Sequence, residues 1–296
     1  MNQKVILSAD SPCDLGPELQ QRYDVHFYPF HILLGDASYT DSVDIQPDDL
    51  YRAWHERKLL PKTAAITPLE YAEYFRQWVE AGYEVVHVNI GSALSSGYQN
   101  CCAAARALGH VYPVNSCNLS TGIGLLVLRA GELIRQGMPA AEIQQVLNAL
   151  VPCSHASFVL DTLEFMRAGG RCSAVTAFGA NLLHLKPCIQ VHTEKEGAMG
   201  VGKKYRGAME TVLPVYIRDQ LSAYADPVPD HVFLTHSGVP ESWLQVSRKA
   251  VEAAGIFKEI HVTRASCTIS SHCGPGTLGV LFKMCIRDRT GFMPAR

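Results

Sequence analysis

The chain has 296 residues, of which 47% are apolar and 18% are charged, and its formal net charge at pH 7 is −2. A chain of this length exceeds what one hydrophobic core usually organises, so we expect two α/β domains. The small net charge argues against nucleic acid as the main partner, and no apolar run approaches the ~18 residues of a membrane span.

Only three apolar residues follow Lys4 before the chain becomes polar, which is too short for the apolar region of a signal peptide. We therefore expect a cytoplasmic protein. The ten cysteines include no Cys-x-x-Cys pair, so their spacing predicts neither a zinc site nor a thioredoxin-type motif, and we expect no metal. Most of these cysteines should be small buried hydrophobic side chains.

The first predicted element is a short buried strand at 5–8, which leads into a turn with Asp10, Ser11 and a proline. A helix at about 15–22 and an extended segment at 25–34 follow. Asp10 and Ser11 therefore follow the carboxyl end of a strand, where open α/β sheets bind ligands. The alternative for Asp10 is a local role as a helix cap or Asx turn.

An acidic helix start at 46–51 precedes a strongly signalled helix. Thr67, Pro68 and Glu70 form a capping box, and apolar side chains keep helical spacing behind it. Thr63 lies just before this helix and has no evident structural purpose.

Residues 84–108 form the stretch around which the chain is organised. The pattern predicts a buried strand at 84–89, a hydroxyl-rich turn with Ser92, Ser95 and Ser96, and a helix at 100–108. Free N–H groups at the helix start and the serine hydroxyls converge on one point, which favours a carboxylate or phosphate oxygen. The alternative is that these serines only cap the helix.

The same arrangement recurs as a strand at 111–114, a polar, glycine-containing turn at 115–124 and a helix at 125–135. Right-handed crossovers place successive turns at one edge of a parallel sheet, so the turns after Leu7, Ile90 and Val114 should lie together and form the site. An amphipathic helix then runs from about 138 to 150, and we expect a domain boundary at Val151-Pro152.

The second half contains predicted strands near 158–160, 188–191, 232–235 and 260–262, with helices at about 207–224 and 240–254. A further helix within 163–173 is ended by glycines. Arg167 and Arg171 lie on this helix and its exit turn, where they could serve a partner or an anion or simply be solvated. His272 precedes a glycine-rich loop with Gly274, in which the backbone could approach a ligand, although a structural or surface histidine is the alternative.

Taken together, these segments resemble the DegV family of bacterial fatty-acid-binding proteins over about residues 4–282. The resemblance rests on Ser8-Ala9-Asp10-Ser11, Asp14-Leu15, Lys62-Thr63, Ser92-Ala93-Leu94-Ser95, Ser116, Ser120-Thr121-Gly122-Ile123-Gly124, Gly169-Gly170-Arg171, Leu185-Lys186-Pro187 and His272-Cys273-Gly274-Pro275-Gly276. It implies a mostly parallel α/β domain at 1–152 and a second α/β domain at 153–283, with one long-chain fatty acid between them. The tail at 284–296 has no family counterpart.

By this resemblance, Thr63 and Ser95 bind the carboxyl group and His272 lies close to it. Ser92, Gly274 and Arg206 complete the expected ligand-binding set. No cofactor is implied. An acyl chain of ~16 carbons would gain on the order of 10 kcal/mol from burial, so few polar groups are needed for affinity, and a neutral Thr–Ser pair avoids an uncompensated buried charge.

The resemblance also implies that the protein is the carrier subunit of a fatty acid kinase whose catalytic protein is a separate chain. Arg171 and Arg167 would contact that partner, and a transient contact with a membrane surface suits such a carrier. The chain departs from the family at Ala64-Ala65-Ile66, at Ser95-Ser96-Gly97-Tyr98 and at Asn115, which puts the local backbone geometry and the chain-length preference in question.

Two other classes of function stay open. A serine hydrolase would use Ser95 or Ser92 as nucleophile, His272 as base and Asp10 to orient it, but the chain has no Gly-x-Ser-x-Gly elbow. A phosphate-binding module would use the turn at 120–124, but this turn lacks a Walker lysine. The chain also lacks the recognisable motifs of a phosphoryl-transfer enzyme, so we expect no such activity from it alone.

Overall fold

The structure is a computed structural model that describes residues 4–176, 185–224 and 226–284. In the amino-terminal half, a four-stranded parallel sheet has the strand order β2-β1-β6-β7. Its strands are β1 (Val5–Asp10), β2 (Val25–Tyr28), β6 (Glu84–Asn89) and β7 (Val111–Asn115). Every residue of β6 is buried, which explains why its valines do not alternate with exposed polar residues and why His87 and Asn89 are hydrogen-bonded inside the protein.

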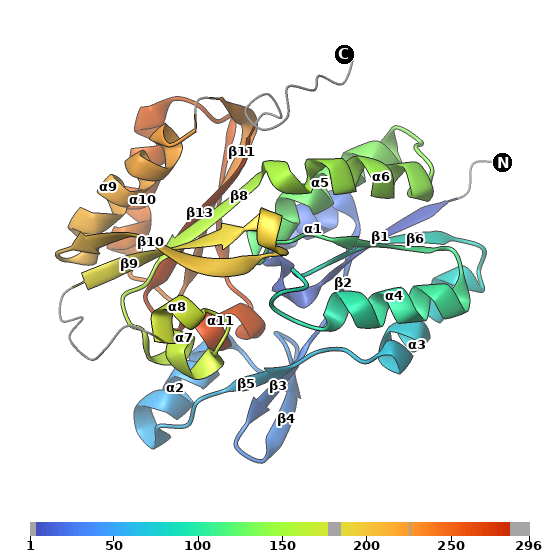
Figure 1. Cartoon of the computed structure of the whole chain (residues 1–296), viewed down its shortest axis with the longest axis horizontal. Coiled ribbons are helices and arrows are strands. Elements are labelled where there is room, and N and C mark those ends of the chain that lie inside the picture. Colours follow the sequence, from blue (N-terminus) through green and yellow to red (C-terminus); the bar gives the residue numbers. More distant parts are fainter. Residues whose placement is uncertain (1–3, 177–184, 225, 285–296) are drawn as a thin grey trace.

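Helices cover both faces of this sheet (Figure 1). On one face lie α3 (Pro68–Val79) and α4 (Gly97–Leu108), and on the other lie α5 (Thr121–Arg135) and α6 (Ala140–Leu150), while α1 (Pro17–Tyr23) follows β1. The predicted capping box of α3 is confirmed, because Glu70 N donates to Thr67 Oγ1 and the Glu70 carboxylate accepts from Thr67 N.

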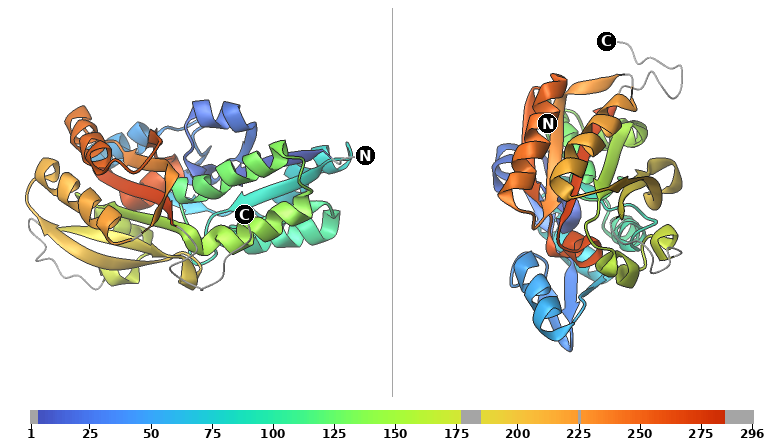
Figure 2. Two further views of the ribbon diagram at one scale, coloured as in Figure 1. Left: turned by 90° about the horizontal axis from the view of Figure 1, so that it is seen from above. Right: turned by 90° about the vertical axis from the view of Figure 1, so that its left-hand side faces the viewer.

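A small antiparallel sheet of three strands projects at one end of the molecule together with α2 (Pro47–Arg57) (Figures 1 and 2). Its strands are β3 (His31–Leu34), β4 (Ala37–Thr40) and β5 (Lys62–Ala64). The extended segment predicted at 25–34 is thus divided between two sheets. Pro29 lies at the division, where its missing N–H and fixed φ favour an interruption of the strand.

The carboxyl-terminal half forms a six-stranded sheet with the order β10-β9-β8-β13-β11-β12, in which only the pair β11–β12 is parallel. The strands are β8 (Ser154–Val159), β9 (Leu185–His192), β10 (Ala198–Arg206), β11 (Pro227–Ser237), β12 (Glu259–Arg264) and β13 (Thr277–Met284). The helices are α7 (Glu164–Gly169), α8 (Ser173–Thr176), α9 (Met209–Ser222), α10 (Glu241–Ala254) and α11 (Cys267–Cys273).

The four strands and two long helices predicted for this half are present, but β10 and β13 were missed. The segment around His272 was interpreted as a loop, and the structure instead forms helix α11 there. Ser266 caps this helix, because its Oγ accepts from Ile269 N. The helix has only seven residues and buries six of them, so its composition gave no amphipathic pattern to recognise.

The two large sheets share one continuous core. Leu7 and Val86 of the first sheet belong to the same buried apolar cluster as Phe158 and Leu281 of the second. Helix α5 lies between them and contacts strands of both. All strands of the four-stranded sheet precede residue 152 and all strands of the six-stranded sheet follow it, yet the side chains on either side of this residue pack together.

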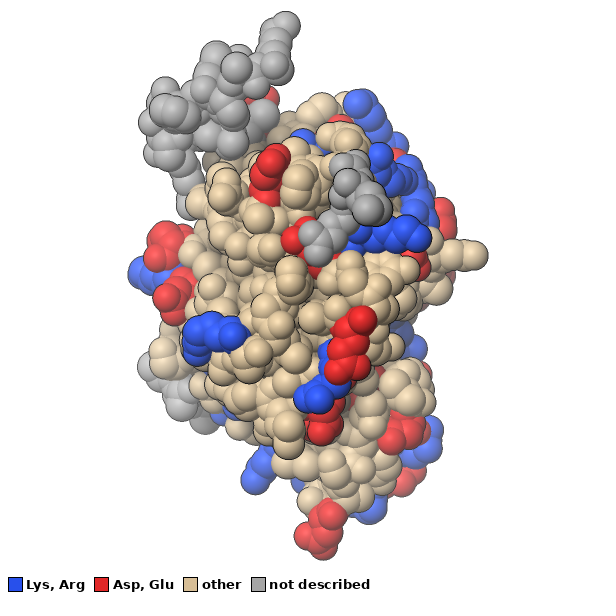
Figure 3. All heavy atoms as spheres, turned by 90° about the vertical axis from the view of Figure 1, so that its right-hand side faces the viewer, with Lys and Arg blue, Asp and Glu red and all other residues tan. Residues whose placement is uncertain are grey.

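None of the helices in the described parts of the chain is long and apolar enough to cross a membrane. On the face shown in Figure 3, Lys and Arg side chains gather at one upper margin beside acidic ones, and a broad area is uncharged. This distribution fits the small net charge of the chain.

Candidate functional site

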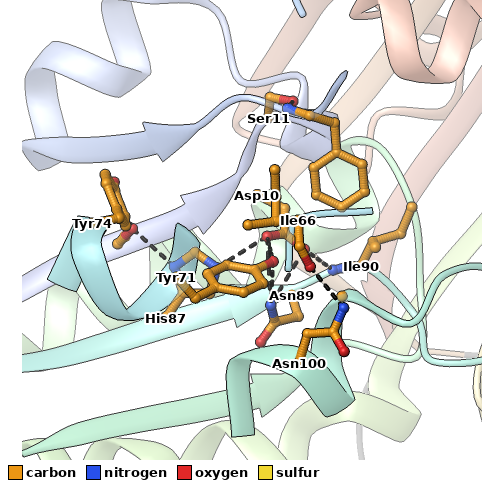
Figure 4. A network of polar contacts seen from close by, with 12 residues as sticks. Asp10, Ser11, Ile66, Tyr71, Tyr74, His87, Asn89, Ile90 and Asn100 are labelled. Carbon is orange, nitrogen blue, oxygen red and sulfur yellow. Dashed lines mark hydrogen bonds and ion pairs between the residues drawn. The ribbon is translucent and has the colours of Figure 1, made fainter. Parts of the chain in front are cut away.

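The predicted convergence of three turns is confirmed. The parallel order β1-β6-β7 brings the carboxyl ends of these strands together, and hydrogen bonds join the turns that follow them. Ile90 N donates to Asp10 Oδ2 over 2.9 Å, and Ser92 N donates to Asn115 Oδ1 over 3.2 Å. Figure 4 shows the first of these contacts.

A cavity with an empty volume of about 730 Å³, including its open mouth, lies beside these turns. Its apolar lining comes from both halves of the chain: Phe30, Ala65, Ile90, Leu94, Leu119, Met199, Ile269 and Cys273. Its polar lining consists of Thr63, Ser95, Ser96, Arg171, Thr268 and His272. A mostly apolar cavity with a few convergent polar groups is typical of a site for a small ligand with one polar end.

Thr63 and His272 meet at this cavity although they are 209 residues apart, and Thr63 Oγ1 lies 2.9 Å from His272 Nε2. Burial, and after it the positive charge of Arg171, lower the pKa of His272 to about 4, so the ring is neutral at pH 7. Its Nδ1 is buried against Gly169 without a hydrogen-bond partner. An unpaired acceptor costs less than an unpaired N–H, so the proton belongs on Nε2, from which it is donated to Thr63 Oγ1.

This tautomer leaves the hydroxyl proton of Thr63 available to a ligand. Ser95 has the same arrangement, because its Oγ accepts from Gly97 N over 3.1 Å at the start of α4. Ser95 therefore combines the two roles considered for it. Its Oγ accepts from the N–H of the first residue of α4, and its side chain also lines the cavity. Thr63 Oγ1 and Ser95 Oγ each accept a hydrogen bond from the protein, and each can donate its own O–H. Such a pair suits a ligand group that accepts hydrogen bonds, such as a carboxyl group.

Arg171, which we expected to contact a partner or an anion, lines the cavity. Its side chain is exposed, and Nη1 donates to Gly169 O over 2.8 Å. The positive charge of this guanidinium acts on the neutral imidazole of His272. The polar end of the cavity therefore combines two hydroxyl donors with one cation, which favours an anionic ligand group.

Helix α11, which carries His272, is held by two buried carboxylates from the amino-terminal half. Asp41 accepts from Cys267 N over 2.8 Å and from Thr268 Oγ1 over 2.6 Å. Asp14 accepts from Ser266 N over 2.8 Å, and its burial raises the pKa of this carboxyl to about 7. Both carboxylates bind backbone N–H groups at the amino-terminal end of α11, where an acceptor is needed.

A second hollow, with an empty volume of about 330 Å³, adjoins the cavity and shares Leu119, Ile269 and Cys273 with it. Phe158 and Leu281 contribute to its far wall. The hollow is nearly filled by its lining, which includes residues of β8, β11 and β13.

A larger hollow of about 1010 Å³ lies on the other side of the loop after β1, but Asp14 and Asp41 line it. Both carboxyl groups already accept hydrogen bonds from protein donors, so they offer no free donor to an anionic ligand.

A sequence model described as an uncharacterised protein of the DegV family matches residues 4–284. The chain belongs to the DegV family. A DegV domain-containing protein of Clostridium acetobutylicum is 27% identical over 282 residues, which cover 95% of this chain and 98% of that protein.

The solved structures agree with the α/β fold implied by the resemblance. A fatty-acid-binding DegV family protein from Thermus thermophilus superposes with a TM-score of 0.86 at 29% identity, covering 96% of this chain and all of that one. A DegV family structure from Ruminococcus gnavus, described with vaccenic acid, has a TM-score of 0.84 at 19% identity, covering 94% and 99% of the two chains. The second likeness shows the fold alone.

Three residues that the DegV resemblance assigned to ligand binding lie outside the cavity lining. Ser92 Oγ donates to Glu196 Oε2 and accepts from Asn115 Nδ2, so its hydroxyl is already occupied. Gly274 ends α11 with a φ of +75°, and a Cβ at this position would lie 2.8 Å from the Phe165 ring, so it is needed for packing.

The remaining two arginines of the predicted site are surface residues. Arg206, the third ligand-binding prediction outside the lining, is exposed at the last position of β10. Arg167, expected at a partner interface, is exposed on α7 near the cavity residue Arg171 in the sequence but does not line the cavity.

Asp10 has neither of the two roles considered for it. It is fully buried and accepts from Tyr71 Oη over 2.6 Å, from His87 Nε2 over 3.0 Å and from the Ile90 N–H (Figure 4). It makes no side-chain cap and does not line the cavity. The hydrolase alternative loses its orienting carboxylate, because Asp10 contacts His87 and not His272.

The turn at 120–124, considered as a phosphate site, is closed by protein contacts. Ser120 Oγ donates to Asp14 Oδ2 over 2.6 Å, and Thr121 Oγ1 shares a hydrogen bond of 2.7 Å with Thr235 Oγ1. Both side chains are buried. The Ser120 hydroxyl is therefore bound within the amino-terminal half, the Thr121 hydroxyl joins the two halves of the chain, and neither is available to a phosphate.

Proposed function

We propose that this DegV family protein binds one long-chain fatty acid, with its carboxyl group at Thr63 and Ser95 and its acyl chain in the apolar cavity. The observation that carries the proposal is the pair of hydroxyls with uncommitted protons at the polar end of that cavity. A carboxyl group accepts two hydrogen bonds from such a pair, while the neutral His272 adds no buried charge.

The apolar lining supplies most of the affinity in this proposal. Each buried CH₂ contributes about 0.8 kcal/mol, so a chain of ~16 carbons gains on the order of 10 kcal/mol. The Thermus thermophilus relative, which is described as binding fatty acid and is similar along nearly the whole chain, supports this assignment.

We further propose that the protein presents the bound fatty acid to a separate kinase for formation of an acyl phosphate. Such a transfer requires a carboxyl oxygen that an outside protein can reach. The exposed Arg171 at the cavity supports this arrangement, since it could contact both the carboxyl group and a partner, and Arg167 on α7 would extend the contact surface.

Native mass spectrometry of the protein purified without detergent tests the binding proposal. We expect a bound mass that matches a C16 or C18 fatty acid at one molecule per chain, and its removal should lower the melting temperature. A chain that stays unliganded and does not bind added palmitate would overturn the proposal.

The kinase proposal has its own test. Lipid-loaded protein with Mg²⁺ and labelled ATP should yield acyl phosphate only after a fatty acid kinase catalytic protein is added. Label that appears on the lipid without that protein would make this chain the enzyme. No label with all components present, while lipid is bound, would refute presentation to the kinase and leave binding intact.

A further inference from the structure

A second group of chemically reactive side chains lies on the edge of the six-stranded sheet, away from the cavity lining. His231 on β11 and Glu259 on β12 are directly paired in the parallel register, and His261 follows Glu259 by two residues. Alternate residues of a strand point to the same face, so the three side chains meet on one face of the sheet. No part of the proposed fatty acid function uses them.

The distances between the imidazole nitrogens and carboxylate oxygens of these residues are close to those between the ligands of a metal ion. His231 Nδ1 lies 3.1 Å from His261 Nε2 and 3.9 Å from Glu259 Oε1, while the other carboxylate oxygen, Oε2, lies 3.7 Å from His261 Nε2. One ligand atom from each of the three residues lies within 4.8 Å of the other two. In a tetrahedral zinc site with bonds of 2.0–2.1 Å, neighbouring ligand atoms are about 3.4 Å apart. Small side-chain adjustments would therefore place all three atoms around one ion.

The surroundings of the cluster favour a bound cation. The His231 side chain is 8% exposed and that of His261 is 17% exposed, whereas Glu259 at 39% leaves one side open. Asp230, Glu132 and Glu18 act on these rings from neighbouring elements and outnumber Lys283 and Arg22.

Arg22 of α1 fixes the carboxylate, because its Nη1 donates to Glu259 Oε2 over 3.1 Å. This contact leaves Oε1, the oxygen nearer to His231, for a metal ion. A hydrogen bond that orients a ligating carboxylate is a regular feature of metal sites. The two imidazoles share a hydrogen bond.

We propose that His231, Glu259 and His261 form a Zn²⁺ site with an open fourth position. Two imidazoles and one carboxylate are an established zinc ligand set. The ion would join the edge strand β12 to β11 and, through Arg22, to helix α1 of the other half of the chain. The sequence prediction of no metal was based on cysteine spacing alone. These three residues come together through the register of β11 and β12, which the sequence does not reveal.

The test uses the full chain, kept reduced, stripped with chelator and titrated with Zn²⁺ against a competing indicator. We expect one ion per chain, and a loss of at least tenfold in affinity in each of His231→Gln and His261→Gln. His192→Gln is the matched control, since His192 Nδ1 lies 3.2 Å from Glu194 in a pair that forms no such three-residue cluster. Zinc binding that is unchanged in the double variant would overturn the proposal.

Co²⁺ binding to the unaltered chain keeps the proposal testable if a variant fails to fold. We expect the visible absorption of a tetrahedral ion without a thiolate charge-transfer band, together with a rise in melting temperature on addition of Zn²⁺. A thiolate band at the first equivalent of metal would assign the binding to cysteines and refute the proposed ligands.

Discussion

Thr63 and Ser95 reach the cavity from a short strand and a helix start in the amino-terminal half, whereas His272 reaches it on helix α11 from the far end of the chain. The first two side chains are placed mainly by local structure. The third depends on Asp14 and Asp41, which accept hydrogen bonds at the amino-terminal end of α11.

This difference predicts that some variants lose affinity for the ligand and others lose stability of the fold. Removal of the Thr63 or Ser95 hydroxyl leaves the strand or helix start that carries it largely intact, so ligand binding should weaken while the fold persists. Removal of the Asp14 or Asp41 carboxylate leaves buried N–H and O–H donors at the start of α11 unpaired, so the fold itself should lose stability. The variants below test that separation.

The largest effect is expected for Asp41→Ala. Asp41 accepts from Ser11 Oγ, Cys267 N and Thr268 Oγ1, and we expect a loss of about 3 kcal/mol or more in the free energy of unfolding because these donors lose a buried charged acceptor. Urea denaturation measures it. Asp44→Ala is the control, since Asp44 is exposed and accepts mainly from its own turn. Equal losses in both variants would contradict the role of Asp41.

His272 should make the protein less stable in acid. Its folded pKa is about 4 against 6.5 for a free imidazole, so below pH 6.5 the unfolded chain binds a proton that the folded chain does not. The free energy of unfolding should fall by about 1–3 kcal/mol between pH 6.5 and pH 4. His272→Gln should remove this dependence, as measured by denaturation at a series of pH values.

Asp14 should change the free energy of unfolding with pH in the opposite direction to His272. Its folded pKa of about 7 lies above its ordinary 3.8, so its contribution is full below pH 3.8 and is lost as pH rises toward 7. It therefore opposes His272, and Asp14→Asn should steepen the acid destabilisation. A flatter profile in this variant would contradict the assignment of the two groups.

Thr63→Ala and Ser95→Ala should each weaken palmitate binding by about 0.5–1.5 kcal/mol, which is about two- to tenfold in Kd. Their unfolding free energies should stay near that of the unaltered protein, in contrast to Asp41→Ala. Ser92→Ala is the control from the same turn, since the Ser92 hydroxyl is bonded to Glu196. Fluorescence displacement gives the affinities, and an unchanged Kd in the Thr63/Ser95 double variant would refute the site.

The smallest effect is expected for Arg171→Ala. The guanidinium is exposed, and exposed ion pairs contribute about 0.2–1 kcal/mol, so palmitate affinity should fall less than fivefold and the difference should shrink in salt. Arg167→Ala should leave affinity unchanged because Arg167 lies outside the lining. A loss of more than tenfold that persists in salt would make Arg171 the main carboxyl contact.

The sequence could predict the parts of the site that depend on neighbouring residues. The capping box at Thr67, the buried strand β6 and the turn with Ser95 follow from local patterns, and the parallel order of the strands makes their turns converge. The family resemblance added Thr63 and His272, which line the same cavity.

The features that were missed depend on contacts between distant segments. Helix α11 is too short and too buried to show a helical pattern, and its anchors Asp14 and Asp41 lie more than two hundred residues away in the chain. Ser92 looked equivalent to Ser95 because the sequence does not reveal that Glu196, 104 residues later, occupies its hydroxyl. The tail at 285–296 lies outside the described residues.

The most direct test of the binding site is the NMR spectrum of palmitate labelled with ¹³C at its carboxyl carbon and bound to the protein. We predict one bound carboxyl resonance that shifts in Thr63→Ala and in Ser95→Ala but not in Ser92→Ala, because only the first two remove a hydrogen bond to the carboxyl group. A bound resonance with the same chemical shift in all four proteins would contradict the placement of the carboxyl group at Thr63 and Ser95.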